Sequence, residues 1–339
     1  MPTPAPPPRP RAATALAPVL REEVFGPRGM RELADAVDVV AEAPDVRTLL
    51  TDPRRAEVEV LVTSWGAPAL TPDVLDELPA LHTVAHAAGS VRKLVTDAVW
   101  GRGITVISAA EANNEPVAEF VYAHVVLALK DVYRRSRHMA AVKALPPVDD
   151  VPGTLRQTVG LVSFGSVARK VAQRLRRLDT RVLAWDPYLP PDVFDDFQVA
   201  RAFDLSEVVA RSRVLSIHTP LIPGSTEKLV TGELLRLLPA GATLINTARG
   251  AVIDEQAMIE VLTERPDLSA VLDVTAEEPP PADSALYTLP NVMLTGHVAG
   301  TVGGERRAMG RLVVDELRRI GAGLSPLHAV TAEAAPLRA

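Results

Sequence analysis

Short apolar runs alternate with polar, helix-forming stretches along the first third of the chain. Residues 58–65, 81–87 and 103–109 have the apolar character of strands, and residues 72–80 and 91–103 are typical of the helices between them. Strands that alternate with helices in this way predict a parallel sheet.

A longer helical stretch separates this region from a second one of the same kind. From residue 115 to about 135, apolar side chains recur at helical spacing along one stripe, and a proline-rich loop follows. Strands are then expected at 158–162, 181–186, 213–218, 242–246, 270–274 and 291–295, with an amphipathic helix at 254–263 and a last helix at about 303–320. Six strands with helical crossovers match a doubly wound sheet.

The composition is that of an ordinary globular protein, and it narrows the possible partners. With 339 residues, of which 47% are hydrophobic and 23% charged, the chain is long enough for about two domains. Its net charge of −6 without a basic block argues against nucleic acid as a partner. No apolar run approaches a membrane span or the core of a signal peptide, so we expect a cytoplasmic protein with no membrane partner.

Two further features concern the ends of the chain and its lack of cysteine. Residues 1–14 are rich in proline and residues 326–339 in alanine, and both are expected to be disordered tails. The absence of cysteine excludes disulfides and thiol catalysis and removes the softest metal ligands. No metal site is expected.

The stretch 158–171 combines an apolar strand with a helical pattern around a short turn. The turn holds Ser163, Gly165 and Ala168, where a dinucleotide-binding fingerprint has two glycines followed by glycine or alanine. Any Cβ at the position of Gly165 would block the close approach of a pyrophosphate. An ordinary strand–helix turn is the alternative interpretation of this stretch alone.

Asp186 favours the dinucleotide interpretation. It ends the next expected strand, 21 positions after Gly165, where a carboxylate hydrogen-bonds the adenosine ribose. A carboxylate at this point repels a 2′-phosphate, so NAD is expected rather than NADP. The alternative role of Asp186 is to start the turn before Pro187.

Three polar groups follow three later strands, at the edge of the sheet where ligands bind in open α/β folds. They are Arg249, the pair Glu277 and Glu278, and His297. Such a set suits carbonyl reduction: histidine donates a proton near neutral pH, a carboxylate orients the ring, and arginine holds a carboxylate substrate. Taken singly, each has a structural alternative, a solvated loop charge or a satisfied histidine.

These residues lie in segments that resemble the D-isomer-specific 2-hydroxyacid dehydrogenases. The resemblance runs from about residue 58 to 322 and is densest at 216–262 and 272–300. It implies that Arg249 binds the substrate, that Glu278, which directly precedes a proline, supports the acid/base His297, and that NAD is the cofactor. The other cofactor-binding residues that it implies are Gly165, Ser166, Val167, Asp186, His218, Thr219, Pro220, Thr247, Ala248, Asp273 and Gly300.

The resemblance also implies a fold of two doubly wound α/β domains with a cleft between them. A flavodoxin-like substrate domain would comprise residues 15–112 and 299–325, and a Rossmann NAD-binding domain residues 113–298. The nucleotide-binding domain would carry the contact of a homodimer, and the reaction would interconvert a 2-keto acid and a D-2-hydroxy acid.

The substrate loop departs from the family pattern. The segment 87–93 places Arg92 and Lys93 where Asp-Asn is usual, while the backbone amides of Ala88, Gly89 and Ser90 remain available for a substrate carboxylate. Either one cation faces the pocket and favours a substrate with a second negative charge, or both point to solvent. The alternative function from another class is a non-catalytic, NAD-responsive corepressor-like protein. The sequence does not name the substrate.

Overall fold

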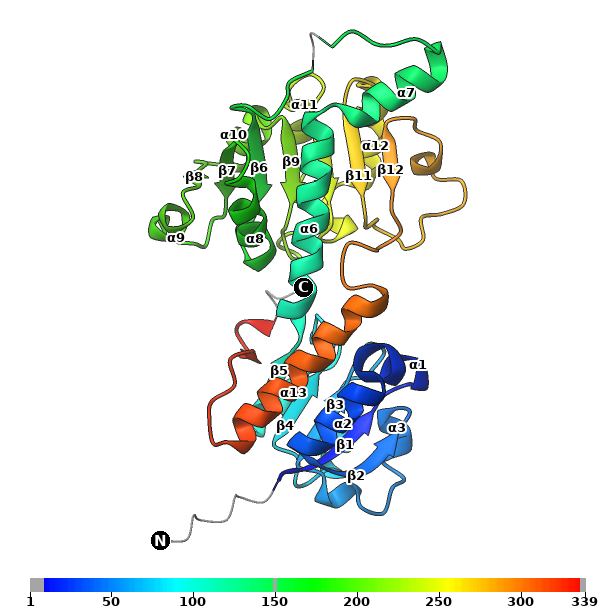
Figure 1. Cartoon of the computed structure of the whole chain (residues 1–339), viewed down its shortest axis with the longest axis vertical. Helices are drawn as coiled ribbons and strands as arrows, with labels where there is room; N and C mark the ends of the chain where they lie inside the picture. The colour runs from blue at the N-terminus through cyan, green and yellow to red at the C-terminus, as the bar shows by residue number, and fades with distance from the viewer. Residues whose placement is uncertain (1–8, 149–150, 336–339) are drawn as a thin grey trace. The chain divides into compact units, whose positions relative to one another are not determined.

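The computed structural model describes residues 9–148 and 151–335. The chain divides into two compact units, which are drawn in Figure 1: Met1–Asn113 with Thr301–Ala339 form the first unit, and Asn114–Gly300 form the second. The predicted borders were 112/113 and 298/299. Both units have the α/β architecture that the sequence predicts.

The first unit is built on a six-stranded sheet. Its strands are β1 (Arg11–Ala15), β2 (Asp38–Ala43), β3 (Val60–Thr63), β4 (Thr83–His86), β5 (Thr105–Ser108) and β13 (Ala329–Val330). They lie in the order β13-β5-β4-β3-β1-β2, and all pair in parallel except β13 with β5. Without the antiparallel edge strand, the order is the flavodoxin-like 2-1-3-4-5.

Short helices cover both faces of this sheet. One face packs against η1, α2 and α13, and the other against α3, α4 and α5. The helices of the first unit are α1 (Pro18–Leu20), η1 (Arg21–Phe25), α2 (Gly26–Ala36), α3 (Val46–Leu49), η2 (Arg55–Glu57), α4 (Pro72–Asp76), α5 (Asp97–Gly101), η5 (Gly303–Arg306) and α13 (Arg307–Gly321).

The second unit holds a seven-stranded, wholly parallel sheet. Its strands are β6 (Thr158–Val162), β7 (Arg181–Trp185), β8 (Ala200–Arg201), β9 (Val214–Ile217), β10 (Thr243–Asn246), β11 (Ser269–Leu272) and β12 (Val292–Leu294). Their order is β12-β11-β10-β9-β6-β7-β8. Counted from β6, this is 3-2-1-4-5-6 with one added strand, the order of a dinucleotide-binding sheet.

Helices also cover both faces of the second sheet. They are α6 (Ala110–Leu129), which begins in the first unit, α7 (Val132–Val142), α8 (Ser166–Leu175), α9 (Pro191–Asp196), α10 (Leu205–Arg211), α11 (Gly232–Arg236), α12 (Glu255–Glu264) and the short turns η3 (Gly250–Val252) and η4 (Ala285–Tyr287). No helix in the described part of the chain is both long and apolar enough to cross a membrane.

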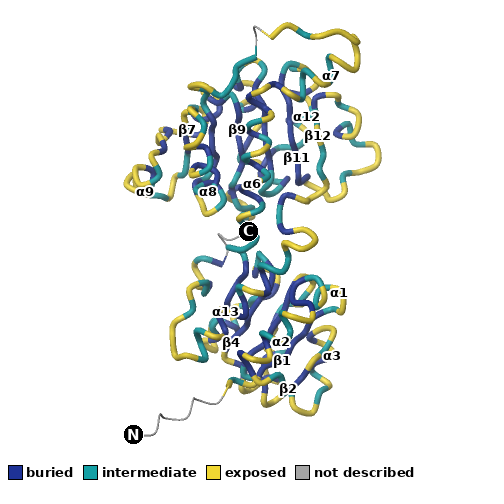
Figure 2. The backbone as a smooth tube through the Cα atoms, in the orientation of Figure 1, coloured by how far each residue is buried: buried dark blue, intermediate teal, exposed yellow. Residues whose placement is uncertain are grey.

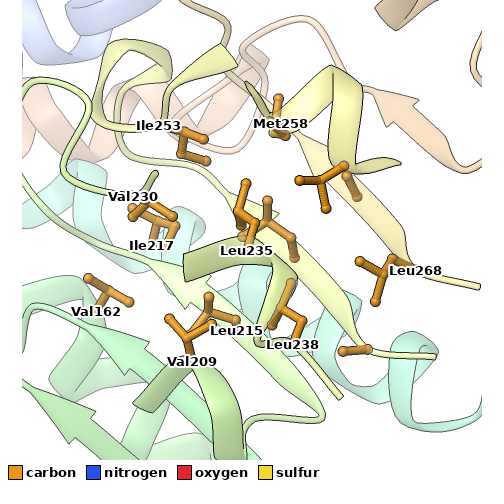
Figure 3. Packing of buried hydrophobic residues seen from close by; sticks show 14 of the residues in the cluster. Val162, Val209, Leu215, Ile217, Val230, Leu235, Leu238, Ile253, Met258 and Leu268 are labelled. Atoms are coloured by element: carbon orange, nitrogen blue, oxygen red, sulfur yellow. The ribbon is translucent and has the colours of Figure 1, made fainter. Parts of the chain in front are cut away.

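Alternate side chains of the central strands enter different cores, which explains why these strands are mostly apolar. In β9, Leu215 and Ile217 pack with Leu235 of α11 and Met258 of α12, as Figure 3 shows, whereas Val214 belongs to the core beneath α6 and α8. A strand buried on both faces has no polar side. In Figure 2 the central strands of the second sheet, such as β9 and β11, are accordingly buried along their length.

Both terminal segments that were predicted to be disordered are shorter than expected, because each contributes a strand to the first sheet. Residues 1–8 and 336–339 lie outside the described residues, but Arg11–Ala15 forms β1 between β2 and β3, and Ala12 and Ala13 are fully buried. At the other end Ala329–Val330 extends the first sheet as β13. Runs of alanine carry little strand signal, because such small side chains become favourable only where neighbouring helices pack closely.

Two predicted helices differ in extent. The helix expected at 115–135 ends at Leu129, because the left-handed backbone of Asp131 (φ 56°) separates α6 from α7. The helix expected at 91–103 is confined to Asp97–Gly101, since Thr96 is extended and donates its hydroxyl to the Leu70 carbonyl, 2.7 Å away.

Gly310 in α13 offers a test of the packing in the first unit. A Cβ at this position would lie 2.3 Å from the carbonyl oxygen of Val24 in η1, so Gly310→Ala forces the two elements apart. We expect the variant to lose about 1–3 kcal/mol of unfolding free energy in urea denaturation, the usual cost of overpacking.

The matched control is Gly321→Ala at the end of the same helix. Nothing lies within 4 Å of a Cβ there, so the higher helix propensity of alanine should stabilise the protein by up to about 1 kcal/mol. An unchanged denaturation midpoint for Gly310→Ala would contradict this account of the packing.

Candidate active site

The strands of the second unit end in register. One row of paired residues crosses six strands and consists of Trp185, Val162, Ile217, Asn246, Leu272 and Leu294. The residues that directly follow this row are Asp186, Ser163, His218, Thr247, Asp273 and Thr295. Most of them are residues that the sequence analysis assigns to a cofactor site. They lie at the same level, just beyond the carboxyl ends of neighbouring strands.

The turn between β6 and α8 has the backbone of a dinucleotide-binding loop despite its missing glycines. Ser163 adopts a left-handed conformation (φ 68°), and its Oγ lies 2.9 Å from Oγ1 of Thr219. Gly165 is the N-cap of α8, and no heavy atom lies within 4 Å of where its Cβ would be. Ser166 and Val167 begin α8, and the N-terminus of a helix attracts anions.

Ala168 and Asp186 fix this turn from two sides. Ala168 is fully buried in the core beneath α8. The carboxylate of Asp186 accepts hydrogen bonds from the backbone N–H of Phe164 and of Tyr188, each at 3.0 Å. Asp186 therefore shapes two turns, and because each carboxylate oxygen can accept a second hydrogen bond, it retains capacity for the hydroxyls of a ribose.

Two buried polar atoms at the same edge have no partner among the described residues. They are Nε2 of His218 and Oγ1 of Thr247. Burial lowers the pKa of His218 to about 3, so the ring is neutral at physiological pH. Buried polar atoms normally have a hydrogen-bond partner, and together with the open space above Gly165 these two atoms fit a dinucleotide.

Asn246, the last residue of β10, shapes the turn that carries Arg249. Its amide nitrogen donates to the carbonyl of Arg249 at 3.0 Å, and its Oδ1 accepts from the N–H of Ala248 at 3.0 Å. The guanidinium of Arg249 donates to the Ala248 carbonyl at 2.6 Å. The sequence interpretation missed Asn246, although an amide at the end of a buried strand is a signal for such a turn.

Gly250 brings this turn against the loop that carries Glu278. A Cβ on Gly250 would lie 1.9 Å from the carbonyl carbon of Thr275 and 2.3 Å from the backbone nitrogen of Ala276. Only glycine permits such an approach of two backbones. The sequence interpretation missed this role as well.

Glu278 and His297 form a hydrogen-bonded pair. Oε2 of Glu278 lies 2.8 Å from Nδ1 of His297, and their side chains are 42% and 55% exposed, which leaves the ring accessible to a small molecule. The structure thus pairs Glu278, and not Glu277, with the histidine. The carbonyl of Glu277 instead accepts from the hydroxyl of Thr275 at 2.6 Å.

Asp273 organises the segment around His297. Its buried carboxylate accepts from the hydroxyl of Thr295 (2.6 Å) and from the N–H groups of Val298 (2.8 Å) and Ala299 (3.0 Å). Its carbonyl accepts the N–H of His297 at 2.8 Å. His297 is thereby held in a left-handed conformation (φ 62°) that non-glycine residues seldom adopt.

The remaining predicted residues fall into two groups. Pro220 lies three residues beyond the end of β9, and Gly300 is the last residue of the second unit. Ala88, Gly89 and Ser90 belong to the first unit and follow β4, and Ser90 Oγ accepts from the N–H of Arg92 at 3.4 Å. Arg92 and Lys93 are exposed. Among the described residues, no group of three or more His, Cys, Asp or Glu side chains could hold a metal ion.

Known proteins resemble this chain along most of its length. It is 33% identical to the (S)-sulfolactate dehydrogenase of Chromohalobacter salexigens over 249 residues, which cover 73% of this chain and 80% of that protein. It is 27% identical to the D-3-phosphoglycerate dehydrogenase of Methanocaldococcus jannaschii over 84% of this chain, but it spans only 55% of that relative.

Solved structures of the same fold include a phosphoglycerate oxidoreductase from Rhizobium etli, with a TM-score of 0.80 and 20% identity. That match covers 98% of both chains. The D-mandelate dehydrogenase of Rhodotorula graminis gives a TM-score of 0.79 at 20% identity and covers 96% of this chain and 98% of that one.

Residues 104–299, more than half of the chain, match the family model described as "D-isomer specific 2-hydroxyacid dehydrogenase, NAD binding domain". The matched region includes nearly all of the second unit, which has the sheet order of a dinucleotide-binding domain, a glycine at the N-cap of α8 and the carboxylate of Asp186 after β7. This chain therefore belongs to the D-isomer-specific 2-hydroxyacid dehydrogenase family, and its second unit is the NAD-binding domain.

Proposed function

We propose that this protein is an NAD(H)-dependent oxidoreductase that interconverts a 2-keto acid and a D-2-hydroxy acid. The observation that carries the proposal is the hydrogen-bonded pair of Glu278 and His297, which stands beside the Arg249 turn at the carboxyl edge of the NAD-binding sheet. Its curated relatives are named dehydrogenases of D-3-phosphoglycerate, (S)-sulfolactate and glycerate.

The chemistry of reduction assigns a task to each side chain. Bound NADH supplies the hydride to the carbonyl carbon. His297 then donates a proton to the carbonyl oxygen as negative charge develops there, and Arg249 holds the substrate carboxylate in a bidentate pair. The carboxylate of Glu278 accepts a hydrogen bond from Nδ1–H of His297, which orients the ring and leaves Nε2 to donate the proton to the substrate.

Each part of the dinucleotide has a matching group in the second unit. The N-terminus of α8 and the open space over Gly165 suit the pyrophosphate, and Asp186 suits the adenosine ribose. Nε2 of His218 and Oγ1 of Thr247, which have no partner within residues 9–148 and 151–335, suit polar groups near the nicotinamide. Asp273, whose carboxylate already accepts three hydrogen bonds, acts mainly by holding the segment of His297.

In the first unit, the backbone amides of Ala88, Gly89 and Ser90 suit the substrate carboxylate. Among the described residues, no acceptor is paired with these three N–H groups. Successive unpaired amides in a turn form an anion-binding concavity.

His297→Ala tests the proposed reaction. Without the proton donor, kcat for reduction of a 2-keto acid with NADH should fall by a factor of about 100 to 10,000, the usual contribution of general acid catalysis. NADH consumption is followed by absorbance, and NADH binding by its fluorescence, which should change little.

The control is His82→Ala, which removes an exposed histidine at the amino end of β4 and should leave kcat unaltered. Activity of His297→Ala near that of the wild type would refute the assignment. NADH binding by the wild type without turnover of any 2-keto acid would instead favour the corepressor-like alternative.

Ser163→Gly tests what the altered fingerprint costs. The left-handed backbone of Ser163 is unfavourable by about 1–2 kcal/mol, and its hydrogen bond to Thr219 returns about 0.5–1.5 kcal/mol. Glycine removes both contributions, so the dissociation constant of NADH should change by less than about threefold.

Ser163→Ala separates the two effects, because it keeps the unfavourable backbone and loses the hydrogen bond. We expect it to lower the free energy of unfolding by about 1 kcal/mol. If Ser163→Gly instead binds NADH more than tenfold tighter, the serine limits cofactor affinity.

We also propose that the protein forms a homodimer through α7, in line with the family resemblance. None of the α7 residues is buried within its own chain, and exposed apolar side chains continue from it into the next loop, notably Met139, Val142 and Leu145. The helix projects from the second unit in Figure 1, and Figure 2 shows its mostly unburied surface. Exposed apolar patches of this kind mark interaction sites.

Light scattering during size-exclusion chromatography tests the dimer. The wild type should elute with twice the chain mass of 36.2 kDa, and Met139→Glu should shift it toward the single chain because a charge is buried without a partner. Val19→Glu, at an exposed apolar residue of the first unit, is the control and should remain dimeric. A monomeric wild type would rule out the proposal.

A further inference from the structure

The first unit carries an accessible tryptophan at the carboxyl edge of its sheet. Trp65 follows β3, is 39% exposed, and has no assigned role in the reaction. Thr63, the last residue of β3, pairs with His86, the last residue of β4. Trp65 and Ala88 each lie two residues beyond this pair, so both follow their strands at the same level. Ser64 ties the two segments together, since its hydroxyl donates to the carbonyl of Ala87 at 2.9 Å.

Open space lies next to this tryptophan. Gly66 has a left-handed backbone (φ 80°), which turns the chain immediately after Trp65, and nothing lies within 4 Å of where a Cβ of Gly66 would be. The neighbouring segment Ala88–Ser90 presents three backbone N–H groups that have no acceptor in the described part of the chain. A substrate whose carboxylate binds to these N–H groups would therefore extend along the ends of β3 and β4, next to Trp65.

The indole of Trp65 contacts the guanidinium of Arg306, whose charge is paired with a carboxylate. The guanidinium carbon of Arg306 lies 5.3 Å from the ring centroid, within the range of a cation–π contact. Arg306 also forms an ion pair with Glu23, and its Nε lies 3.5 Å from the carbonyl of Thr301. The guanidinium of Arg306 thus lies over the indole, and its charge is neutralised by the carboxylate of Glu23.

We propose that Trp65 is a specificity-determining residue that stacks on a planar, uncharged side chain of the substrate, so that aromatic 2-keto acids are preferred. This inference rests on the proposed function. An exposed indole offers a flat apolar surface on which aromatic rings pack in offset or edge-on geometry. A second anionic group gains nothing from Arg306 unless it displaces Glu23.

The test compares three 2-keto acids with the full-length protein and NADH: phenylpyruvate, pyruvate and the doubly charged oxaloacetate. The wild type should show a kcat/KM for phenylpyruvate at least about tenfold above that for either of the others. In Trp65→Leu, which keeps apolar bulk but has no aromatic face, this preference should fall to about threefold or less, mainly through KM. Trp65→Phe should retain most of it.

Two further variants sharpen the comparison. Trp100→Leu, at a tryptophan of α5 that packs in the core on the other side of the first sheet, is the control and should keep the wild-type ratio of phenylpyruvate to pyruvate. Arg92→Ala tests the competing role of charge and should not change that ratio.

The outcomes separate the inference from the function on which it rests. A wild type that prefers oxaloacetate, and loses that preference in Arg92→Ala, overturns the role of Trp65 but not the reaction. Equal losses for all three acids in Trp65→Leu show a structural role only and likewise overturn it. Turnover of no 2-keto acid by the wild type, with NADH bound, overturns the proposed function and the substrate assignment with it.

Discussion

The arrangement of the second unit depends on one constraint, the common register in which its parallel strands end. Because Val162, Ile217, Asn246 and Leu272 lie in one row, the chain leaves four neighbouring strands at the same level. The buried row makes the strands rigid, and the residues just beyond it start from fixed positions. Polar groups placed there therefore need little further support to form a site on a rigid scaffold.

Additional hydrogen bonds surround the segment of His297, whose side chain must have a fixed orientation. Asp273 is buried as a carboxylate, which is unfavourable unless its oxygens are hydrogen-bonded, and the segment 295–299 supplies three donors. The same contacts hold His297 in its unusual backbone conformation. Strained residues of this kind persist only where their surroundings over-determine them, and they concentrate at functional sites.

Much of the fold follows from hydrophobic pattern alone, because strands buried on both faces must be apolar and their helices amphipathic. The pattern located β3, β4 and β5 and all the longer strands of the second unit. It missed β1 and β2, since the alanines of β1 are favourable only in contact with neighbouring elements. It also missed the break at Asp131, which is a backbone feature without a strong residue signal. Glu278 was distinguished from Glu277 by the proline that follows it, through the family resemblance and not through periodicity.

The contacts that no linear pattern contains are those between distant segments. Gly250 and Thr275 are 25 positions apart, and only the folded chain shows that their backbones touch. Asn246 orients the Arg249 turn by short-range hydrogen bonds, so an amide at a strand end was the one signal open to sequence reasoning. The positions of the site residues could thus be predicted from the ends of the strands. The contacts that hold these residues in place could not.

The turn at Ser163 changes what counts as a signature. In the usual motif a single glycine encodes the left-handed angle, whereas here the angle coexists with a hydroxyl pair whose members stand 56 positions apart. The sequence signal for this turn therefore lies in two coupled positions, Ser163 and Thr219, and not in one glycine. A dinucleotide-binding turn of this sort is better recognised by its torsion angles and by covariation of the two sites than by the spacing of glycines.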